Sequence, residues 1–327
     1  MPANLTPDYL KAEEEFKKAK IQHEKLSALR KMLATIPKHK GTDKLQADIK
    51  RRIARLKDEI QQQKKKKGFS ISVQKEGAAQ ITVIGPPNSG KSKLISKLSG
   101  VDLEVAEHPF STHKPFSAMM KFEDIQIQLV DLPPISNIHL EFWVPNIVRI
   151  SDATLLVVDL ADPEILDRIE ETISILKDYK IKIVRYLVDN DPWASIVEKT
   201  TWMIGNKFDL RNAKENWEVI TELYSGKYGL SAVSCTTDQN IEKLRLDIFQ
   251  MLHILRVYSK RPHSETDFLK PFVLKQGSTL LDFATLVHHD FSEKLKFARI
   301  WGHGKFDGQR VNKDYILQDK DIVELHM

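Results

Sequence analysis

Apolar and polar residues alternate with two different periods along the middle of the chain. Short apolar runs with the length and composition of strands occur at 80–84, 125–130, 153–158, 182–188 and 201–204. Stretches of helical composition fall between or after them, at 91–99, 163–178, 214–224 and 240–257. Alternation of this kind is typical of βαβ units and a parallel sheet. We therefore expect a doubly wound α/β domain over residues 68–262.

The N-terminal residues follow a helical pattern instead. One side of a helix is predicted by apolar residues that recur at steps of three and four: Leu45, Ile49, Ile53, Leu56 and Ile60. Pro37 and Gly41 interrupt the pattern, and Thr42 is a suitable cap for the helix that follows. We expect two helices within residues 8–62, which would make residues 1–67 a basic helical hairpin.

The last part of the chain mixes short strands with one helix. The strand signals are at 272–274, 298–301 and 322–325, and the helical stretch is at 279–287. This mixture predicts a compact α+β domain over residues 263–327.

The composition is that of a globular protein without disulfides. Hydrophobic residues make up 41% and charged residues 29% of the 327 residues. The single cysteine, Cys235, excludes a disulfide within the chain and a paired-cysteine metal motif. The longest apolar run, 153–158, is far shorter than the roughly 20 residues of a membrane helix. We expect a cytoplasmic protein that has no membrane partner.

Positive charge is concentrated at the N-terminus. The whole chain has a net charge of +5, but residues 1–67 alone hold 19 basic and 9 acidic residues, a surplus of +10. Such asymmetry indicates contact with a polyanion such as RNA. The alternative is a solvated helical face, which charged runs often are.

The strongest motif lies between a predicted strand and a predicted helix. Residues 85–92, GPPNSGKS, match G-x-x-x-x-G-K-[ST], whose backbone N–H groups form a nest for phosphates. Lys91 would contact the β- and γ-phosphates, and Ser92 would bind Mg²⁺. We expect nucleotide contacts from these residues of the loop and first helical turn: Gly85, Asn88, Ser89, Gly90, Lys91, Ser92 and Lys93. A chance glycine turn is the alternative, which the flanking strand and helix disfavour.

A second motif selects the base. Asn206-Lys207-Phe208-Asp209 follows an apolar strand and matches N-K-x-D. The Asp209 carboxylate would accept the N1–H and the exocyclic amino group of guanine, a donor pair that adenine lacks. Asn206 would hold the base edge and the loop, and Lys207 would lie across the ring. An ATPase is therefore disfavoured, and an ordinary polar turn is the other alternative.

Two shorter segments fit the same class of protein. Ser234-Cys235-Thr236 follows a short strand, at the position of the S-A-K motif that supports the base. Asp131 ends the apolar strand 125–130, at the place of the Walker B aspartate that reaches Mg²⁺ through water. The first match is weak when it is taken alone.

These motifs occur in the order found in one known family. The chain resembles the developmentally regulated GTP-binding proteins within the wider Obg group. The segments that carry the resemblance are the phosphate loop, Pro109-Phe110-Ser111-Thr112, the DLPP segment, NKFD, SCT, the basic hairpin and the tail 321–326. The resemblance covers almost the whole chain. It implies a P-loop GTPase domain and a C-terminal TGS domain of the ubiquitin-like β-grasp fold. It also implies that Thr112, with Ser111 as the alternative, binds Mg²⁺ and the γ-phosphate.

The resemblance also singles out Asn88 and Pro134. Relatives with an asparagine at the position of Asn88 bind K⁺ beside the nucleotide, although this residue also suits a turn. The family motif D-x-x-G reads Asp131-Leu132-Pro133-Pro134 here, so the N–H group that meets the γ-phosphate is lost. Ile135 stands where a water-positioning glutamine is often found. The stretch 162–201 lacks the domain that eukaryotic members insert, which indicates a compact prokaryotic-type relative.

Two functions remain open from the sequence. The first is a slow GTPase that acts on the ribosome or structured RNA, with Lys91, Thr112 and Asn88 as the catalytic residues and GTP, Mg²⁺ and K⁺ as ligands. The second is a non-catalytic, guanine-nucleotide-dependent adaptor that docks a protein partner through the TGS-like domain. Pro134 favours the adaptor, and the resemblance favours the enzyme.

Overall fold

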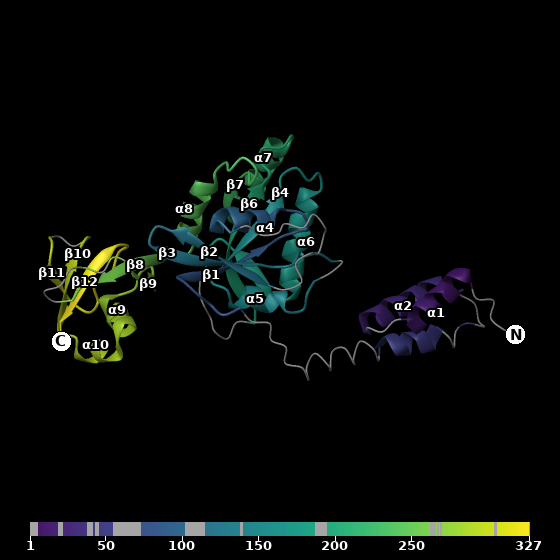
Figure 1. Ribbon diagram of the computed structural model, residues 1–327, viewed down its shortest axis with the longest axis horizontal. Helices are drawn as coiled ribbons and strands as arrows, with labels where there is room; N and C mark the ends of the chain where they lie inside the picture. The colour runs from purple at the N-terminus through teal and green to yellow at the C-terminus, as the bar shows by residue number, and fades with distance from the viewer. Residues whose placement is uncertain are drawn as a thin grey trace. The chain divides into compact units, whose positions relative to one another are not determined.

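The chain forms two compact units, residues 1–71 and residues 72–327, in the computed structural model (Figure 1). The structure describes residues 6–18, 22–37, 42, 46–54, 73–101, 115–137, 140–186, 195–261, 266, 268, 270–303 and 306–326. Among these residues, no helix combines the length and the apolar character that crossing a membrane requires.

The first unit is helical, as expected, but it is not a two-helix hairpin. Its described helices are α1 (Pro7–Lys18), α2 (Gln22–Thr35) and a further helical segment at 46–54. Their apolar residues pack into one small core: Tyr9, Ala12, Leu29, Met32, Ile36 and Ile49. We expected a single helix before Pro37. That part forms two helices because the apolar residues of α1 pack against those of α2, which a continuous helix would prevent.

Seven described strands form the main sheet of the second unit. They are β1 (Ala79–Ile84), β2 (Phe116–Phe122), β3 (Ile125–Asp131), β4 (Ala153–Asp159), β5 (Ile181–Val184), β6 (Val197–Asn206) and β7 (Gly229–Ala232). The order is β2-β3-β1-β4-β6-β5, and β7 also pairs with β6. Only β2 is antiparallel to its neighbour among these strands. The other strands therefore present their carboxyl ends at the same edge of the sheet.

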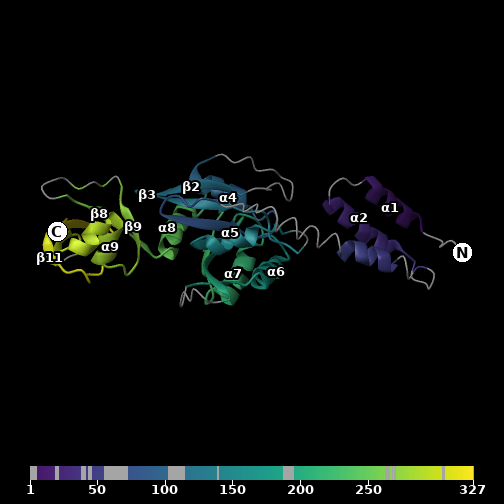
Figure 2. The same ribbon diagram turned by 90° about the horizontal axis from the view of Figure 1, so that it is seen from below.

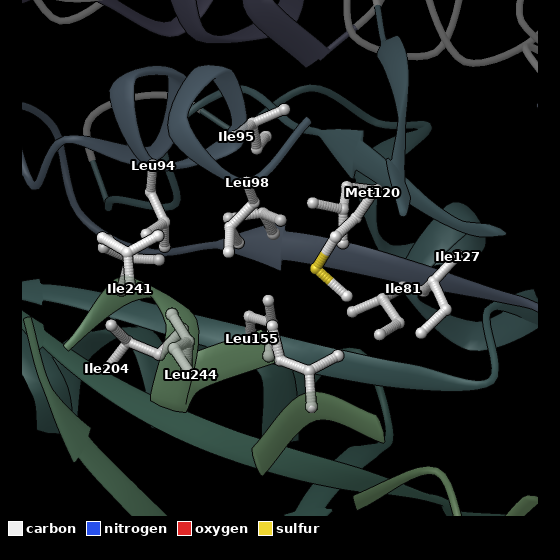
Figure 3. Packing of buried hydrophobic residues seen from close by; sticks show 14 of the residues in the cluster. Ile81, Leu94, Ile95, Leu98, Met120, Ile127, Leu155, Ile204, Ile241 and Leu244 are labelled. Carbon is white, nitrogen blue, oxygen red and sulfur yellow. The ribbon is translucent and has the colours of Figure 1, made fainter. Parts of the chain in front are cut away.

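Helices cover both faces of this sheet, which confirms the doubly wound α/β domain (Figure 2). They are α4 (Lys91–Ser99), α5 (Val144–Ile150), α6 (Ile165–Asp178), α7 (Ala213–Tyr224) and α8 (Ile241–Met251). Figure 3 shows Leu94 and Leu98 of α4, with Ile241 and Leu244 of α8, facing the apolar side chains of the strands. β1 is buried along its whole length, and every residue of β4 except the last is buried. This burial explains why both strands are nearly continuous apolar runs.

A second, five-stranded sheet forms the C-terminal part. Its order is β11 (Gln309–Val311), β10 (Phe297–Trp301), β12 (Asp321–His326), β8 (Ile254–Ser259) and β9 (Phe272–Lys275). The helices α9 (Leu280–Val287) and α10 (His289–Lys294) belong to the same part. Thr279 begins α9 with a capping box that it forms with Asp282.

The start of this second sheet differs from the expectation. We expected one helix over 240–257, but α8 ends at Met251 and β8 begins at Ile254. Leu255 and Val257 alternate with Arg256 and belong to the core of the second sheet, a period of two that indicates a strand. The second sheet therefore begins inside the range 68–262 that we assigned to the α/β domain.

Candidate functional site

The loop between β1 and α4 has the backbone geometry of a phosphate-binding nest. Gly85 has φ 146°, and a Cβ atom there would lie 2.1 Å from the carbonyl oxygen of Val157. Gly90 has φ 87°, and its Cβ would lie 2.2 Å from Nδ2 of Asn206. Only glycine satisfies both the space and the backbone at these two positions. α4 begins at Lys91, so its free N–H groups point toward the loop.

Lys91 lies inside this loop and is 7% exposed. Its Nζ atom donates to the carbonyl oxygens of Pro86 at 2.8 Å and Gly85 at 3.2 Å. Burial lowers the pKa of Lys91 to about 8, and the nearby charge of Asp131 opposes that shift. A phosphate group can replace these neutral carbonyl partners and raise the pKa again, because an opposite charge favours the ammonium form.

Ser92 and Asp131 meet where β3 ends beside α4. The Ser92 hydroxyl donates to Oδ2 of Asp131 at 2.6 Å. Oδ1 of Asp131 is buried and has no hydrogen-bond partner in the described part of the chain. Burial raises the pKa of Asp131, against the hydrogen bond from Ser92 and the charge of Lys91. A hydroxyl beside a buried carboxylate with an unused oxygen is a donor set that fits Mg²⁺.

The segment that follows Asp131 is packed into the protein. Residues 132–136, which include Pro134, are all buried. The N–H group of Ile135 donates to the carbonyl oxygen of Gly85 at 3.1 Å, and the N–H group of Asn137 donates to the Glu171 carboxylate at 2.8 Å. The first N–H group after Pro134 is therefore bonded to the phosphate loop itself.

Asn206 connects the three loops that the motifs predicted. Its Nδ2 atom donates to the carbonyl oxygen of Ser89 at 3.0 Å. Its Oδ1 atom accepts the N–H groups of Lys207 at 2.8 Å and Cys235 at 3.4 Å. Because the ends of β1, β6 and β7 share one edge of the sheet, residues that are 117 positions apart come into contact. Asn206 therefore holds the loops together, as expected.

Asp209 and the 234–236 segment also lie side by side. The hydroxyl of Ser234 donates to Oδ1 of Asp209, and its oxygen accepts the N–H group of Thr236 at 3.2 Å. Ser234 is fully buried, whereas Asp209 is exposed and therefore open to a base. Lys93 of α4 donates to Oγ1 of Thr236 at 3.1 Å, and burial raises the pKa of the Cys235 thiol to about 11. The 234–236 segment therefore lies beside the carboxylate that is predicted to bind the base, and its role in supporting the base stays a prediction.

Asp159 was not among the residues that the motifs predicted for the site. This residue ends β4, and its Oδ2 atom lies 2.6 Å from Nζ of Lys207. Its other carboxylate oxygen accepts the N–H group of Ala161 at 2.9 Å. The pair fixes the ammonium end of Lys207, whose backbone has a left-handed φ of 63°. An aspartate directly after a buried apolar run was the signal that could have identified it.

The remaining candidates fall into two groups. Ser111 and Thr112 lie outside the described residues, so their expected contacts with Mg²⁺ and the γ-phosphate stay predictions. Asn88 is exposed and has φ 60°, a conformation that asparagine tolerates better than most residues. This geometry leaves both the turn and the K⁺ interpretation open.

Comparisons with known proteins agree with this geometry. Residues 80–190 match the family described as 50S ribosome-binding GTPase, and residues 256–327 match the TGS domain. The chain is 24% identical to an uncharacterised GTP-binding protein of Methanocaldococcus jannaschii, over 98% of this chain and 94% of that protein. It is 26% identical to developmentally-regulated G-protein 1 of Arabidopsis thaliana, over 92% of this chain and 90% of that protein.

A solved structure supports the fold. The crystal structure of a GTP-binding protein from Pyrococcus horikoshii has a TM-score of 0.50 at 18% identity, and covers 76% of this chain and 99% of that one. The chain is therefore a protein of the P-loop GTPase fold with a C-terminal TGS domain. Within that class its sequence is similar to those of developmentally regulated GTP-binding proteins over most of its length, in agreement with the resemblance seen in the sequence.

Proposed function

We propose that this GTP-binding protein slowly hydrolyses GTP to GDP and phosphate. The observation that supports the proposal most is the meeting of four motif loops at one edge of the sheet. Asp209 stands at one end of this edge, beside Ser234. Lys91 and the Ser92–Asp131 pair stand at the other, where the phosphate loop meets the end of β3.

At the phosphate end of the site, the protein would act by positioning the phosphate groups and by placing positive charge beside their oxygens. Lys91 would leave the carbonyl oxygens of Gly85 and Pro86 for the β- and γ-phosphates, and the N–H groups at the start of α4 would bind the remaining oxygens. Ser92 and Asp131 would hold Mg²⁺. The ion would supply positive charge for the phosphate oxygens during transfer. Thr112, which lies outside the described residues, is the residue predicted to contact Mg²⁺ and the γ-phosphate as well.

The base end of the site would select guanine. The Asp209 carboxylate is exposed on one side and anchored by the Ser234 hydroxyl on the other, so its orientation is set before a base arrives. Adenine presents no pair of donors to that carboxylate, and a desolvated, unpaired carboxylate costs free energy. Lys207, held by Asp159, would cover one face of the base ring.

Slow turnover follows from the segment after Asp131. Pro134 has no N–H group, and the N–H group of Ile135 is bonded to Gly85. A γ-phosphate would therefore lack the usual backbone donor at this point unless that bond breaks. A K⁺ ion bound near Asn88 would supply some of the missing positive charge.

We further propose that a cytoplasmic ribosome or structured RNA is the partner. The name of the family matched by residues 80–190, 50S ribosome-binding GTPase, supports this role. The surplus of +10 in residues 1–67 supports it independently, because a phosphate backbone attracts such charge. Arg51 and Lys50 are exposed on the described helix at 46–54.

A multiple-turnover GTPase assay with Mg²⁺ tests the catalytic proposal. We expect several GTP molecules to be hydrolysed per protein molecule, and Lys91→Ala to remove this activity. Lys97→Ala is the matched control, because Lys97 lies on the same helix but pairs with Asp238 at the surface. If the parent binds GTP and releases no phosphate over many hours, the adaptor function replaces the enzymatic one. The buried 132–136 segment is the observation that favours the adaptor.

A further inference from the structure

A pocket of about 680 Å³ lies at the opposite edge of the main sheet from the nucleotide loops. One wall comes from the first residues of β1, β4 and β6 and from the end of α8. The other wall comes from β9 of the second sheet, so we call it the junction pocket. Its volume lies within the roughly 300–1,000 Å³ that is typical of small-molecule sites.

Lys199 of β6 lines this pocket and is 7% exposed. Its Nζ atom donates to the carbonyl oxygen of Arg149 at 3.0 Å and to that of Ser151. Both partners are neutral, and in the described residues no carboxylate lies within ion-pair distance of this Nζ atom. Burial lowers the pKa of Lys199 to about 8, and the charge of Asp152 opposes that shift. A buried cation without an ion-pair partner of its own is costly, and a bound anion would offset that cost.

The carboxylates of the pocket are already engaged by other cations. Asp152 pairs with Lys75 at 2.7 Å, and Glu198 pairs with Lys182 at 2.7 Å. Lys275 of β9 lines the mouth of the pocket and is exposed, without an ion pair in the described residues. The pocket therefore carries positive charge from both of its walls that its own carboxylates do not neutralise.

Aromatic and apolar side chains form a further part of the lining. The rings of Tyr186 and His253 lie 5.7 Å apart at an angle of 52°, and both line the pocket. Met251, Val273 and Leu274 add apolar surface. We propose that the junction pocket binds a small organic anion, whose phosphate or carboxylate group contacts Lys199 and Lys275 and whose flat ring lies against Tyr186 and His253.

The competing explanation is structural. Arg149 and Ser151 lie at the carboxyl end of α5, and a lysine there can simply bind the last carbonyl oxygens of the helix. That role needs neither Lys275 nor the aromatic rings. A test of the proposal must therefore measure attraction of an anion, because a stability change alone would fit both explanations.

Pyridoxal 5′-phosphate is a suitable probe because it combines a flat ring with a phosphate group. Its aldehyde forms an imine with an unprotonated lysine amine and releases water, and borohydride then reduces the imine to a stable amine. The full chain is treated with this probe or with pyridoxal, which lacks the phosphate. Peptide mass spectrometry then gives the labelling of Lys199 relative to exposed Lys177 in the same sample. Labelling of Lys91 is measured on a different peptide, so it does not affect this ratio.

We expect the Lys199-to-Lys177 ratio to be about tenfold higher with pyridoxal phosphate than with pyridoxal, because a phosphate group bound to Lys275 would hold the aldehyde beside Lys199. A charge-assisted hydrogen bond contributes at least that factor. Lys275→Met should reduce this preference several-fold, while Lys296→Met, at an exposed residue just before β10 of the same sheet, should leave it unchanged. Phenyl phosphate or benzoate should protect Lys199, and the better competitor identifies the anionic group. Equal ratios with both reagents, or protection by neither competitor, would overturn the proposal. Neither result depends on GTP binding or hydrolysis.

Discussion

Arg256 joins the two sheets of the second unit, and its removal gives a sharp test of the fold. This β8 residue is 2% exposed. Its guanidinium donates to Asp319 at 2.6 and 3.0 Å, to Glu123 at 2.6 Å and to Asp124 at 2.7 Å. Glu123 and Asp124 form the turn between β2 and β3 of the main sheet. The guanidinium also lies 4.9 Å from the ring centroid of Phe249.

Arg256→Met keeps most of the apolar stem and removes the charge. Breaking a buried ion pair from one side costs about 3–5 kcal/mol. Here the carboxylates are partly solvated, with Glu123 half exposed, so we reduce the expected loss to about 2–4 kcal/mol. For a unit of this size, that corresponds to a fall in Tm of roughly 5–15 °C. Arg168→Met is the matched control, because Arg168 also contacts two carboxylates but at the surface, where a loss of at most about 1 kcal/mol is expected.

The loss should depend on pH. Burial acts to raise the pKa of Asp319, but its hydrogen bonds with Arg256 hold that pKa below the ordinary value. A carboxylate whose folded-state pKa is depressed stabilises the fold above its unfolded pKa, near 4, and loses that effect as the pH falls through the folded value. Urea unfolding at pH 7 and pH 3.5 should therefore show a smaller difference between parent and variant in acid. A loss below 1 kcal/mol at pH 7, equal to that of Arg168→Met, would refute the reasoning.

Three further predictions concern function. Pro134→Gly should increase either the preference for GTP over GDP or the rate of GTP turnover, because it restores an N–H group beside the γ-phosphate position. Calorimetry measures the preference and phosphate release measures the turnover. A variant that matches the parent in both would show that the missing N–H group is irrelevant. K⁺ should stimulate hydrolysis relative to Na⁺ at equal ionic strength if Asn88 helps to bind it, and equal rates would exclude that role. Deletion of residues 1–67 should lower the co-sedimentation of the protein with ribosomes and flatten the salt dependence of that binding, while the affinity for GTP stays nearly intact. A lower Tm with unchanged RNA affinity would instead assign the segment a purely stabilising role.

Elements that are specified by a continuous stretch of residues were predicted from the sequence. Elements and contacts that depend on the tertiary structure were not. β1 and β4 were predicted because buried central strands are nearly continuous apolar runs. α5 was missed because its β-branched residues are poor helix formers, and its helical state depends on the burial of Val144, Ile147 and Val148.

The end of α8 was missed for a related reason. No glycine or proline follows Met251, and the turn into β8 is made by His253 with φ 47°, which sequence rules assign to glycine. The nucleotide motifs were found because each is short and lies at a strand end. Asp159 was missed because its role depends on Lys207, which is 48 positions away and contacts it only in the folded chain.

Guanine selection is tested most directly by calorimetry on the parent and on Asp209→Asn. The parent should bind GDP with Mg²⁺ at least tenfold more tightly than ADP, since a site built for two donors rejects a base that lacks them by that factor or more. Asp209→Asn should weaken GDP binding and strengthen xanthosine diphosphate binding, because xanthine has an acceptor where guanine has its amino group. Equal affinities of the parent for GDP and ADP, or a variant with an unchanged base preference, would contradict the assignment of Asp209.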